Sequence, residues 1–291
     1  MFEIYRVLKY IKYKIKKILY KIKKILVVLR SPKKNLINFI YEFYPLENIN
    51  PDIGVIVTSY NYDKFIKDTL DSLVNQTIKI NNIIVIDDGS TDNSVNIIKN
   101  YAKRYDNIMF LQHPDYKNHG LASSVRYALS FSKNKWIAFC ESDDLWDKRH
   151  IEFLVKKIKQ CNIDGVYANK IKLYNNFDKE IYSDYLNRSD IILTERDGIN
   201  IYDYMKKSNI LPTFSAVCVP KYILEKCDFN SYIPQYLDYW LWRQITRKYN
   251  MFYARKSITF WRKHEDSWDR RDNISDISKF LEKNDKIVVK F

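Results

Sequence analysis

The stretch Trp136-Ile-Ala-Phe-Cys-Glu-Ser-Asp-Asp-Leu-Trp146 places an apolar run directly before three carboxylates. The apolar half is typical of a buried strand. Glu141, Asp143 and Asp144 cannot continue into the core, because an unpaired buried charge is too costly. The strand must therefore end before Glu141, with the acidic residues at its carboxyl end. Carboxylate oxygens suit a hard divalent cation, although a solvated acidic turn before a helix is the simpler alternative.

Further apolar runs upstream of this stretch alternate with helical patterns. Strands are predicted at residues 53–58, 83–87, 108–112 and 136–140, and helices at 65–74, 94–105 and 118–132. This alternation predicts an α/β fold with a Rossmann-like, mostly parallel sheet flanked by helices. Ligands of such sheets bind outside the carboxyl ends of the strands. We therefore expect the polar clusters at Thr58–Tyr60, Asp87–Asp88 and Glu141–Asp143 to converge on one crevice.

The excess positive charge is concentrated at the beginning of the chain. Residues 1–34 contain ten Lys, two Arg and one Glu, which account for most of the net charge of +14. The net positive charge is therefore a property of one segment. It argues against a nucleic-acid-binding function for the rest of the chain. The four cysteines form no C-x-x-C pair. They are expected to be free thiols in a reducing cytosol, and they do not indicate a zinc site.

Residues 1–34 are predicted to form an amphipathic basic helix. Apolar residues recur at spacings of three and four from Ile4 to Leu29, with Lys side chains on the other face. Eight Lys in the bilayer would cost on the order of 20 kcal/mol, which excludes a membrane span. We expect the helix to lie on an anionic membrane surface. An acidic protein partner or a self-association seam is the alternative. Residues 35–50 are interpreted as a linker, and no secretory signal is visible.

The second half of the chain is less regular. The pattern predicts a helix at residues 151–160 and strands at 165–173 and 214–219, and leaves residues 174–210 without assignment. The segment Pro234-Gln-Tyr-Leu-Asp-Tyr-Trp-Leu-Trp-Arg243 opens another helix, and residues 272–291 have helical spacing. Asp238 is the only acid in the former segment.

Four motifs in order resemble those of family 2 glycosyltransferases. They are Val55-Ile-Val-Thr-Ser-Tyr-Asn61, Val85-Ile-Asp-Asp-Gly-Ser-Thr-Asp92, Asn118-His-Gly120 and Glu141-Ser-Asp-Asp144. The resemblance covers roughly residues 51–270 and implies the GT-A fold. It also implies a nucleotide-sugar-binding half at residues 51–150 and an acceptor-binding half at 151–270. Residues 271–291, which lie beyond it, are interpreted as a small C-terminal tail that packs on the protein or faces the membrane.

The resemblance implies a donor site for a UDP-sugar. Thr58 and Tyr60 match positions that hold the uracil, and Asp88 matches the aspartate that hydrogen-bonds the base. Asp87 begins the same turn, with a role as a turn or helix-cap residue as the alternative. The positions implied to contact the donor are Thr58, Tyr60, Asp87, Asp88, Asn118, Gly120, Glu141, Ser142 and Asp143.

The resemblance also implies a metal ion, Mn²⁺ or Mg²⁺. Asp143 matches the ligand of the family's D-x-D motif, in which Glu141 replaces the usual first Asp. Phe260-Trp-Arg-Lys-His264-Glu-Asp-Ser267 is similar to a stretch whose histidine completes the metal shell. Asp143 and His264 are therefore the expected metal ligands, although a lone histidine is more often structural.

The resemblance further implies a carboxylate that takes the proton of the acceptor hydroxyl. The segment Pro234–Arg243 is similar to the family segment E/Q-D-x-D-L-W-L-x-R, and in the best register the residue usually assigned as this base falls at Tyr236. We therefore predict Asp238 as the base, with Asp228 as a distant alternate. An N-cap of the helix is an equally weighted alternative for Asp238.

Together these features predict a metal-dependent, inverting glycosyltransferase. It would move a hexose or N-acetylhexosamine from a UDP-sugar to a glycan or lipid-linked glycan, in the assembly of a bacterial-type surface polysaccharide or glycolipid. It would be cytoplasmic and peripheral on the inner face of the membrane, without a nucleic-acid partner. Two alternatives remain. A non-catalytic nucleotide- or glycan-binding relative predicts UDP binding without turnover, and a basic nucleic-acid-binding protein predicts steeply salt-dependent binding.

Overall fold

The computed structural model describes residues 51–161, 166–175, 180–181, 198–207, 209–230, 236–265 and 267. The predicted helix at residues 1–34, the linker at 35–50 and the tail at 271–291 lie outside these ranges. Within the described ranges, no helix is both long and apolar enough to cross a membrane.

The first half of the described chain alternates strands with helices. The elements are β1 (Ile53–Ser59), α3 (Ile66–Val74), β2 (Asn82–Asp87), α4 (Ser94–Arg104), β3 (Ile108–Gln112), α5 (Leu121–Phe131) and β4 (Trp136–Phe139). The strands β3, β2, β1 and β4 are parallel neighbours in that order. β1 is buried along almost its whole length, as expected for a strand covered on both faces. The predicted Rossmann-like half is therefore confirmed.

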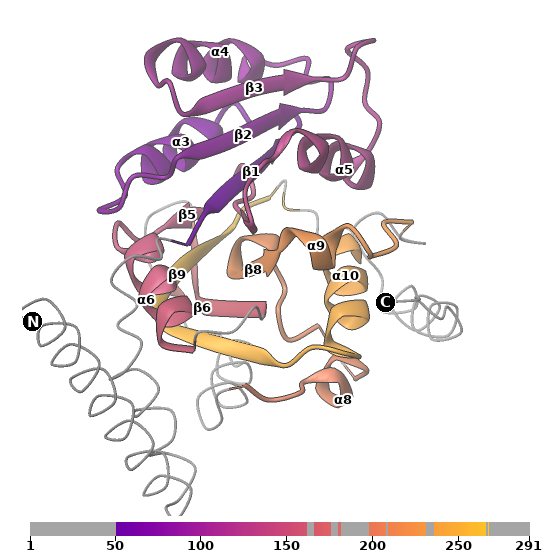
Figure 1. Cartoon of the computed structure of the whole chain (residues 1–291). Helices are drawn as coiled ribbons and strands as arrows, with labels where there is room; N and C mark the ends of the chain where they lie inside the picture. Colours follow the sequence, from indigo (N-terminus) through magenta and orange to yellow (C-terminus); the bar gives the residue numbers. More distant parts are fainter. Residues whose placement is uncertain are drawn as a thin grey trace, which may run out of the picture. The chain divides into compact units, whose positions relative to one another are not determined.

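The second half extends the same sheet and brings in antiparallel pairs. Its elements are β5 (Leu145–Trp146), α6 (His150–Cys161), β6 (Val166–Asn175), β7 (Glu180–Ile181), α8 (Tyr202–Met205), the 3₁₀ turn η2 (Phe214–Ala216), β8 (Val217–Pro220), α9 (Lys221–Leu224), α10 (Leu237–Thr246) and β9 (Met251–Lys263). The strand order is β3-β2-β1-β4-β8-β6-β9-β5, with β7 beside β6. Figure 1 shows β3, β2 and β1 side by side in this sheet. β8 runs antiparallel to both β4 and β6, whereas β6 and β9 are parallel.

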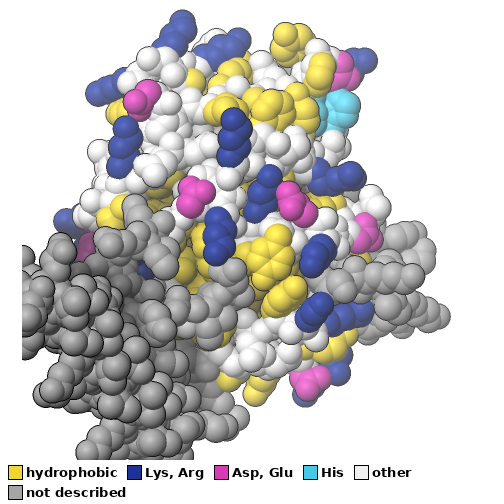
Figure 2. Space-filling view, viewed as in Figure 1, with side chains coloured by type: hydrophobic (Ala, Val, Ile, Leu, Met, Phe, Trp, Pro, Cys, Tyr) yellow, Lys and Arg dark blue, Asp and Glu magenta, His cyan; other side chains and the backbone are white. Residues whose placement is uncertain are grey.

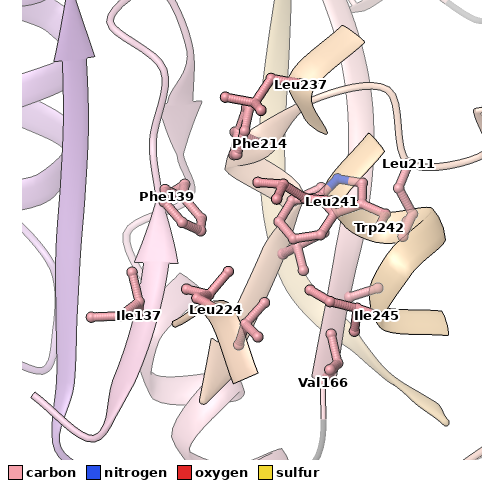
Figure 3. Close-up of a cluster of buried hydrophobic side chains, with 14 of the residues drawn as sticks. Ile137, Phe139, Val166, Leu211, Phe214, Leu224, Leu237, Leu241, Trp242 and Ile245 are labelled. Carbon is pink, nitrogen blue, oxygen red and sulfur yellow. The ribbon is translucent and has the colours of Figure 1, made fainter. Parts of the chain in front are cut away.

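Every residue of helix α10 is buried, the polar Asp238, Arg243, Gln244 and Thr246 included. Trp242 lies among side chains from β4, η2 and the rest of α10 (Figure 3). The ring centroids of Phe214 and Trp242 are 5.5 Å apart, and those of Phe139 and Phe214 are 5.0 Å apart. This packing holds α10 against the sheet and takes Asp238, in its first turn, out of bulk water.

Two predicted elements are wrong at their beginning. The strand expected at residues 214–219 begins only at Val217, because residues 214–216 form a 3₁₀ turn in which the Thr213 side chain accepts from the Ser215 N–H. The helix expected at residues 118–132 begins at Leu121. Gly120 has φ of 83°, which is incompatible with a right-handed helix, so residues 118–120 form a loop.

The surface seen in Figure 2 carries charges of both signs. Lys and Arg side chains are dispersed over this face, with Asp, Glu and hydrophobic groups among them. Some large apolar side chains among the described residues are also exposed, with Tyr116 the most exposed at 71%. Scattered apolar groups of this kind are ordinary on a protein surface.

Candidate donor and metal site

The three predicted polar clusters lie at the carboxyl ends of neighbouring parallel strands. Ser59 pairs with Asp87 at the ends of β1 and β2. The Asp88 N–H donates to the Ser59 carbonyl at 2.9 Å, and the Cys140 N–H donates to the Ile56 carbonyl at 3.0 Å. β1, β2 and β4 therefore end side by side, and the residues that follow them occupy one edge of the sheet.

The end of β1 presents an aromatic side chain to solvent. Thr58 is partly buried and Tyr60 is 39% exposed, so the Tyr60 ring is accessible for stacking. The next residue, Asn61, has φ of 56° and accepts through its side-chain oxygen from the Thr91 N–H at 2.8 Å. This contact ties the loop after β1 to the turn after β2. The roles of Thr58 and Tyr60 toward a base stay predictions.

Asp87 holds the turn that follows β2. Its Oδ1 accepts from the Gly89 N–H at 3.2 Å and from the Ser90 N–H at 3.0 Å, and its Oδ2 accepts from the Ser90 hydroxyl at 2.6 Å. The side chain is fully buried. This is the turn role named as the alternative for Asp87.

Asp88 is bound to the loop before α5 and to that helix. Its Oδ1 accepts from the His119 N–H and from the Ser124 hydroxyl, both at 2.9 Å, and its Oδ2 accepts from the Gly120 N–H at 2.9 Å. Asp88 is only 5% exposed. Oδ1 already accepts two hydrogen bonds, whereas Oδ2 accepts only one. The predicted contact with a base therefore has to use Oδ2, which can accept a second hydrogen bond.

The 118–120 loop is held close to the turn after β2. At Gly89, which has φ of 82°, a Cβ atom would lie 2.7 Å from the backbone carbon of Lys117. The close approach therefore needs glycine. At Gly120 a Cβ would meet no atom within 4 Å. Asn118 is exposed and Gly120 is partly buried, so both remain accessible for the predicted diphosphate contact.

The acidic turn after β4 has few hydrogen-bond donors for its charge. The Thr213 hydroxyl lies 2.6 Å from Glu141 Oε2 and 2.8 Å from Asp144 Oδ2, and it carries only one hydrogen. Burial and repulsion between the neighbouring carboxylates raise the pKa of Glu141 well above its ordinary value. The same causes, in the same order, raise the pKa of Asp144 to about 7. A nearby cation would relieve this repulsion.

Asp143 contacts the predicted histidine. His264 Nε2 lies 3.1 Å from Asp143 Oδ2. The His264 ring is 3% exposed and packs against the Phe65 ring with centroids 4.3 Å apart. Its Nδ1 has no hydrogen-bond partner among the described residues.

The Asp143–His264 pair fits a small octahedral cation. Two ligands at right angles around Mg²⁺ lie about 3 Å apart, and such ions usually take only one or two protein ligands beside substrate phosphates. The described residues contain no group of three His, Cys, Asp or Glu side chains arranged to hold a metal ion. The pair would therefore hold a metal together with a ligand that brings its own oxygens. Ser142, between the acids, is buried, and its carbonyl accepts from the Thr69 hydroxyl at 2.9 Å.

Asp238 lies in the first turn of α10 and not at its N-cap. The helix begins at Leu237 after Tyr236, so the cap alternative is wrong. Asp238 Oδ2 accepts from the Asn209 side-chain amide at 3.2 Å. Burial raises the pKa of Asp238 to about 7. The charge of Asp238 is also the last of the causes, after burial and the neighbouring carboxylates, that raise the pKa of Glu141.

Two functional side chains of the site were missed by sequence reasoning. Thr213 and Ser215 come from the turn before β8, yet they contact the acidic turn after β4. A Thr-x-Ser segment is too common to be a signal. Only the antiparallel pairing of β4 with β8 brings the two segments together.

The chain belongs to glycosyl transferase family 2, whose family model matches residues 54–220. Its fold is the GT-A fold of this class. Glycosyltransferase GlyA of Streptococcus pneumoniae is 26% identical over 171 residues, which are 58% of this chain and 24% of that protein. Poly(ribitol-phosphate) beta-glucosyltransferase of Bacillus spizizenii is 30% identical over 150 residues, covering 51% of this chain and 19% of that protein.

Solved structures show the same fold at low sequence identity. The crystal structure of S. aureus TarS 1-349 in complex with UDP-GlcNAc has a TM-score of 0.60 and 18% identity, over 80% of this chain and 65% of that one. Mannosyltransferase PcManGT from Pyrobaculum calidifontis, in complex with GDP-Man and Mn²⁺, has a TM-score of 0.56 and 14% identity, over 77% and 60%. The chain spans from 11% to 56% of the length of the first three curated relatives that it matches.

Proposed function

We propose that the chain is a metal-dependent, inverting glycosyltransferase. It moves a hexose or N-acetylhexosamine from a UDP-sugar to a hydroxyl group of a glycan or lipid-linked glycan. The observation that carries the proposal is the Asp143–His264 contact of 3.1 Å at the strand edge where Thr58 and Tyr60 also lie. The family match and the nucleotide-sugar complexes of the structural neighbours support a donor of this class.

On the donor side, the protein binds the UDP-sugar and neutralises the charge of its diphosphate. Tyr60 is exposed enough to stack on the uracil, and Asp88 holds the loop whose Asn118 and Gly120 face the diphosphate. Asp143 and His264 hold the divalent cation, Mn²⁺ or Mg²⁺. When bound, this ion neutralises the charge that develops on the departing diphosphate.

The acceptor side needs a base. Asp238, with its pKa raised to about 7, is ionised in a large part of the molecules at neutral pH and still binds a proton well. It takes the proton of the acceptor hydroxyl as that oxygen bonds to the anomeric carbon. The bond from this carbon to the diphosphate breaks on the opposite side, and UDP leaves. This displacement inverts the anomeric configuration.

The acceptor is proposed to belong to a bacterial cell-surface polysaccharide. The support is that one relative is a poly(ribitol-phosphate) beta-glucosyltransferase and that another is named "Minor teichoic acid biosynthesis protein GgaB". In this proposal the enzyme acts in the cytoplasm on the inner face of the membrane. Residues 1–34 contact the anionic lipid surface.

The first experiment is a donor panel. UDP-sugars with Mn²⁺ are tested for slow hydrolysis and for transfer, with the full chain, with Asp143→Ala and with the control Asp106→Ala. Asp106 is an exposed acid in a surface ion pair with Lys79, so its variant should behave as the wild type. We expect one donor to be turned over in a reaction that requires metal. This turnover should be lost in Asp143→Ala and kept in Asp106→Ala. A folded, metal-loaded chain that neither binds nor turns over any UDP-sugar would contradict the proposal.

One observation favours a second candidate, a non-catalytic nucleotide- or glycan-binding relative. Tyr236 stands at the position usually taken by the base, and it is partly buried against the core. This candidate predicts UDP binding of normal affinity with no transfer to any acceptor. Binding by calorimetry together with the donor panel separates the two functions.

A further inference from the structure

Thr213 is the centre of a buried hydrogen-bond group that reaches the acidic turn from the other half of the chain. It is 1% exposed. Its hydroxyl contacts Glu141 and Asp144 at 2.6 and 2.8 Å, and it also accepts from the Ser215 N–H at 3.1 Å. One small side chain therefore touches both ends of the four-residue turn that contains Asp143.

Ser215 adds a second connection to the same turn. Its hydroxyl accepts from the Glu141 N–H at 2.8 Å, and its carbonyl accepts from the Trp146 indole N–H at 3.1 Å. The same carbonyl also accepts from the Thr259 hydroxyl of β9 at 2.8 Å. The turn before β8 thus joins the end of β4 to β9.

Asp144 carries the connection on to the histidine. Its Oδ2 contacts Thr213, and its Oδ1 accepts from the Arg262 N–H at 3.0 Å. Arg262 lies two residues before His264, whose Nε2 contacts Asp143. Two contacts therefore hold the acidic turn to the end of β9. Asp144 binds the Arg262 N–H, and Asp143 lies against His264.

We infer that Thr213 is a positioning residue that fixes the 141–144 turn, and through Asp144 the end of β9, so that Asp143 and His264 face each other. This inference rests on the proposed function, because it concerns how well the pair binds the metal and the donor diphosphate. Partners that orient ligand side chains typically contribute about 10- to 100-fold to metal affinity or activity. The Thr213 hydroxyl provides this orientation without touching the donor.

The test compares substitutions that remove or keep the hydroxyl. Thr213→Val preserves the shape and removes the hydroxyl, whereas Thr213→Ser keeps it. Thr246→Val is the matched control, because Thr246 is also fully buried but donates to the Trp242 carbonyl within α10. Each variant is titrated with UDP in the presence and absence of Mn²⁺ by calorimetry, and kcat and the donor KM are measured with the active UDP-sugar.

We expect Thr213→Val to weaken Mn²⁺-dependent UDP binding and to raise the donor KM by about 10- to 100-fold. Thr213→Ser should restore most of this loss, and Thr246→Val should bind as the wild type. A Thr213→Val variant that binds UDP and Mn²⁺ normally would overturn the inference. So would a Thr213→Ser variant that is folded and as weak as Thr213→Val, or an equal loss in Thr246→Val.

The inference and the proposed function can fail separately. If the wild-type chain neither binds nor turns over any UDP-sugar, the proposed function fails. The position of residues 141–144 in a crystal structure of Thr213→Val then decides the inference. A displaced turn, in which Asp143 and His264 no longer lie within hydrogen-bond distance of each other, supports it. An unchanged turn overturns it.

Discussion

The turn after β2 and the turn after β4 place carboxylates at the same edge of the sheet but in different surroundings. Asp87 and Asp88 accept from four backbone N–H groups and two hydroxyls of their own turn, of the loop before α5 and of the beginning of that helix, and Asp87 also accepts from the Gln112 side-chain amide of β3. Glu141 and Asp144 share the single hydroxyl of Thr213, and Asp144 accepts in addition from one backbone N–H, that of Arg262. The first turn is therefore satisfied by the protein itself, whereas the second has more negative charge than its donors can compensate.

Because of this difference, the two turns are suited to different roles. Charge-assisted hydrogen bonds from N–H groups make a rigid support, so the β2 turn holds the 118–120 loop in place. Buried carboxylates without enough donors raise one another's pKa, so the β4 turn is suited to a cation. Substitutions in the two turns and at Asp238 test this contrast.

Replacing the proposed base should have the largest effect. Asp238→Asn is expected to lower kcat by about 10²- to 10⁴-fold, the usual contribution of a general base. In the wild type, kcat should rise with pH through about 7, because only ionised Asp238 accepts a proton, and this rise should disappear in the variant. The measurement is kcat between about pH 5.5 and 9, with Asp228→Asn as the control. A base at Asp228 would reverse the behaviour of the two variants.

The same side chain should make stability depend on pH. The folded-state pKa of Asp238 is raised to about 7 from its ordinary 3.8. Between these values the folded chain binds more protons than the unfolded chain, so the contribution of Asp238 to stability falls as pH rises. Urea unfolding at about pH 5 and about pH 8 should show a smaller decrease in Asp238→Asn than in the wild type.

Metal binding should stabilise the chain through the β4 turn. With UDP present and Mn²⁺ at about 100 times its Kd, the free energy of unfolding should rise by about 2.7 kcal/mol. Asp143→Ala should lose this gain, and Asp106→Ala should keep it. Thermal unfolding with and without Mn²⁺ measures the effect. Equal stabilisation of Asp143→Ala would place the cation elsewhere.

Removing a carboxylate from the β2 turn should reduce stability. Asp88→Ala removes the acceptor of the His119 and Gly120 N–H groups and of the Ser124 hydroxyl, and a donor that is left buried without a partner costs about 1–3 kcal/mol. Asp88→Asn keeps one acceptor oxygen and should lose less. Urea denaturation compares the two variants. If both are as stable as the wild type, the β2 turn is not the support described above.

The smallest effect should come from the glycine beside that support. Gly89→Ala adds a Cβ 2.7 Å from the Lys117 backbone at φ of 82°, whereas Gly120→Ala has nearly the same φ and no atom within 4 Å. The strained backbone costs about 1–3 kcal/mol in each variant, and Gly120, with ψ of 160°, lies in a region that essentially only glycine adopts. The additional loss in Gly89→Ala measures how tightly the 116–118 segment packs on the turn. Equal losses would show that this segment moves away freely.

Much of the first half of the fold can be predicted from the sequence. The strand at Ile108–Gln112 has the predicted bounds, and the strands β1, β2 and β4 differ from theirs by one residue. Apolar runs that end in polar residues are local features, so the sequence shows them directly. The failures at residues 118–120 and 214–216 are also local in cause. A left-handed glycine and a side-chain-to-backbone hydrogen bond each override the hydrophobic pattern.

The local sequence specifies which carboxylates stand at the ends of the parallel strands, because an apolar run and the polar residues that end it lie within a few residues of each other. The partners of those carboxylates depend instead on how the chain folds. Thr213 is 72 residues from Glu141, and His264 is 121 residues from Asp143. Such contacts depend on how β8 and β9 pair within the sheet. The pairing follows from burying α10 and the rest of the core, and no short stretch of sequence contains that information.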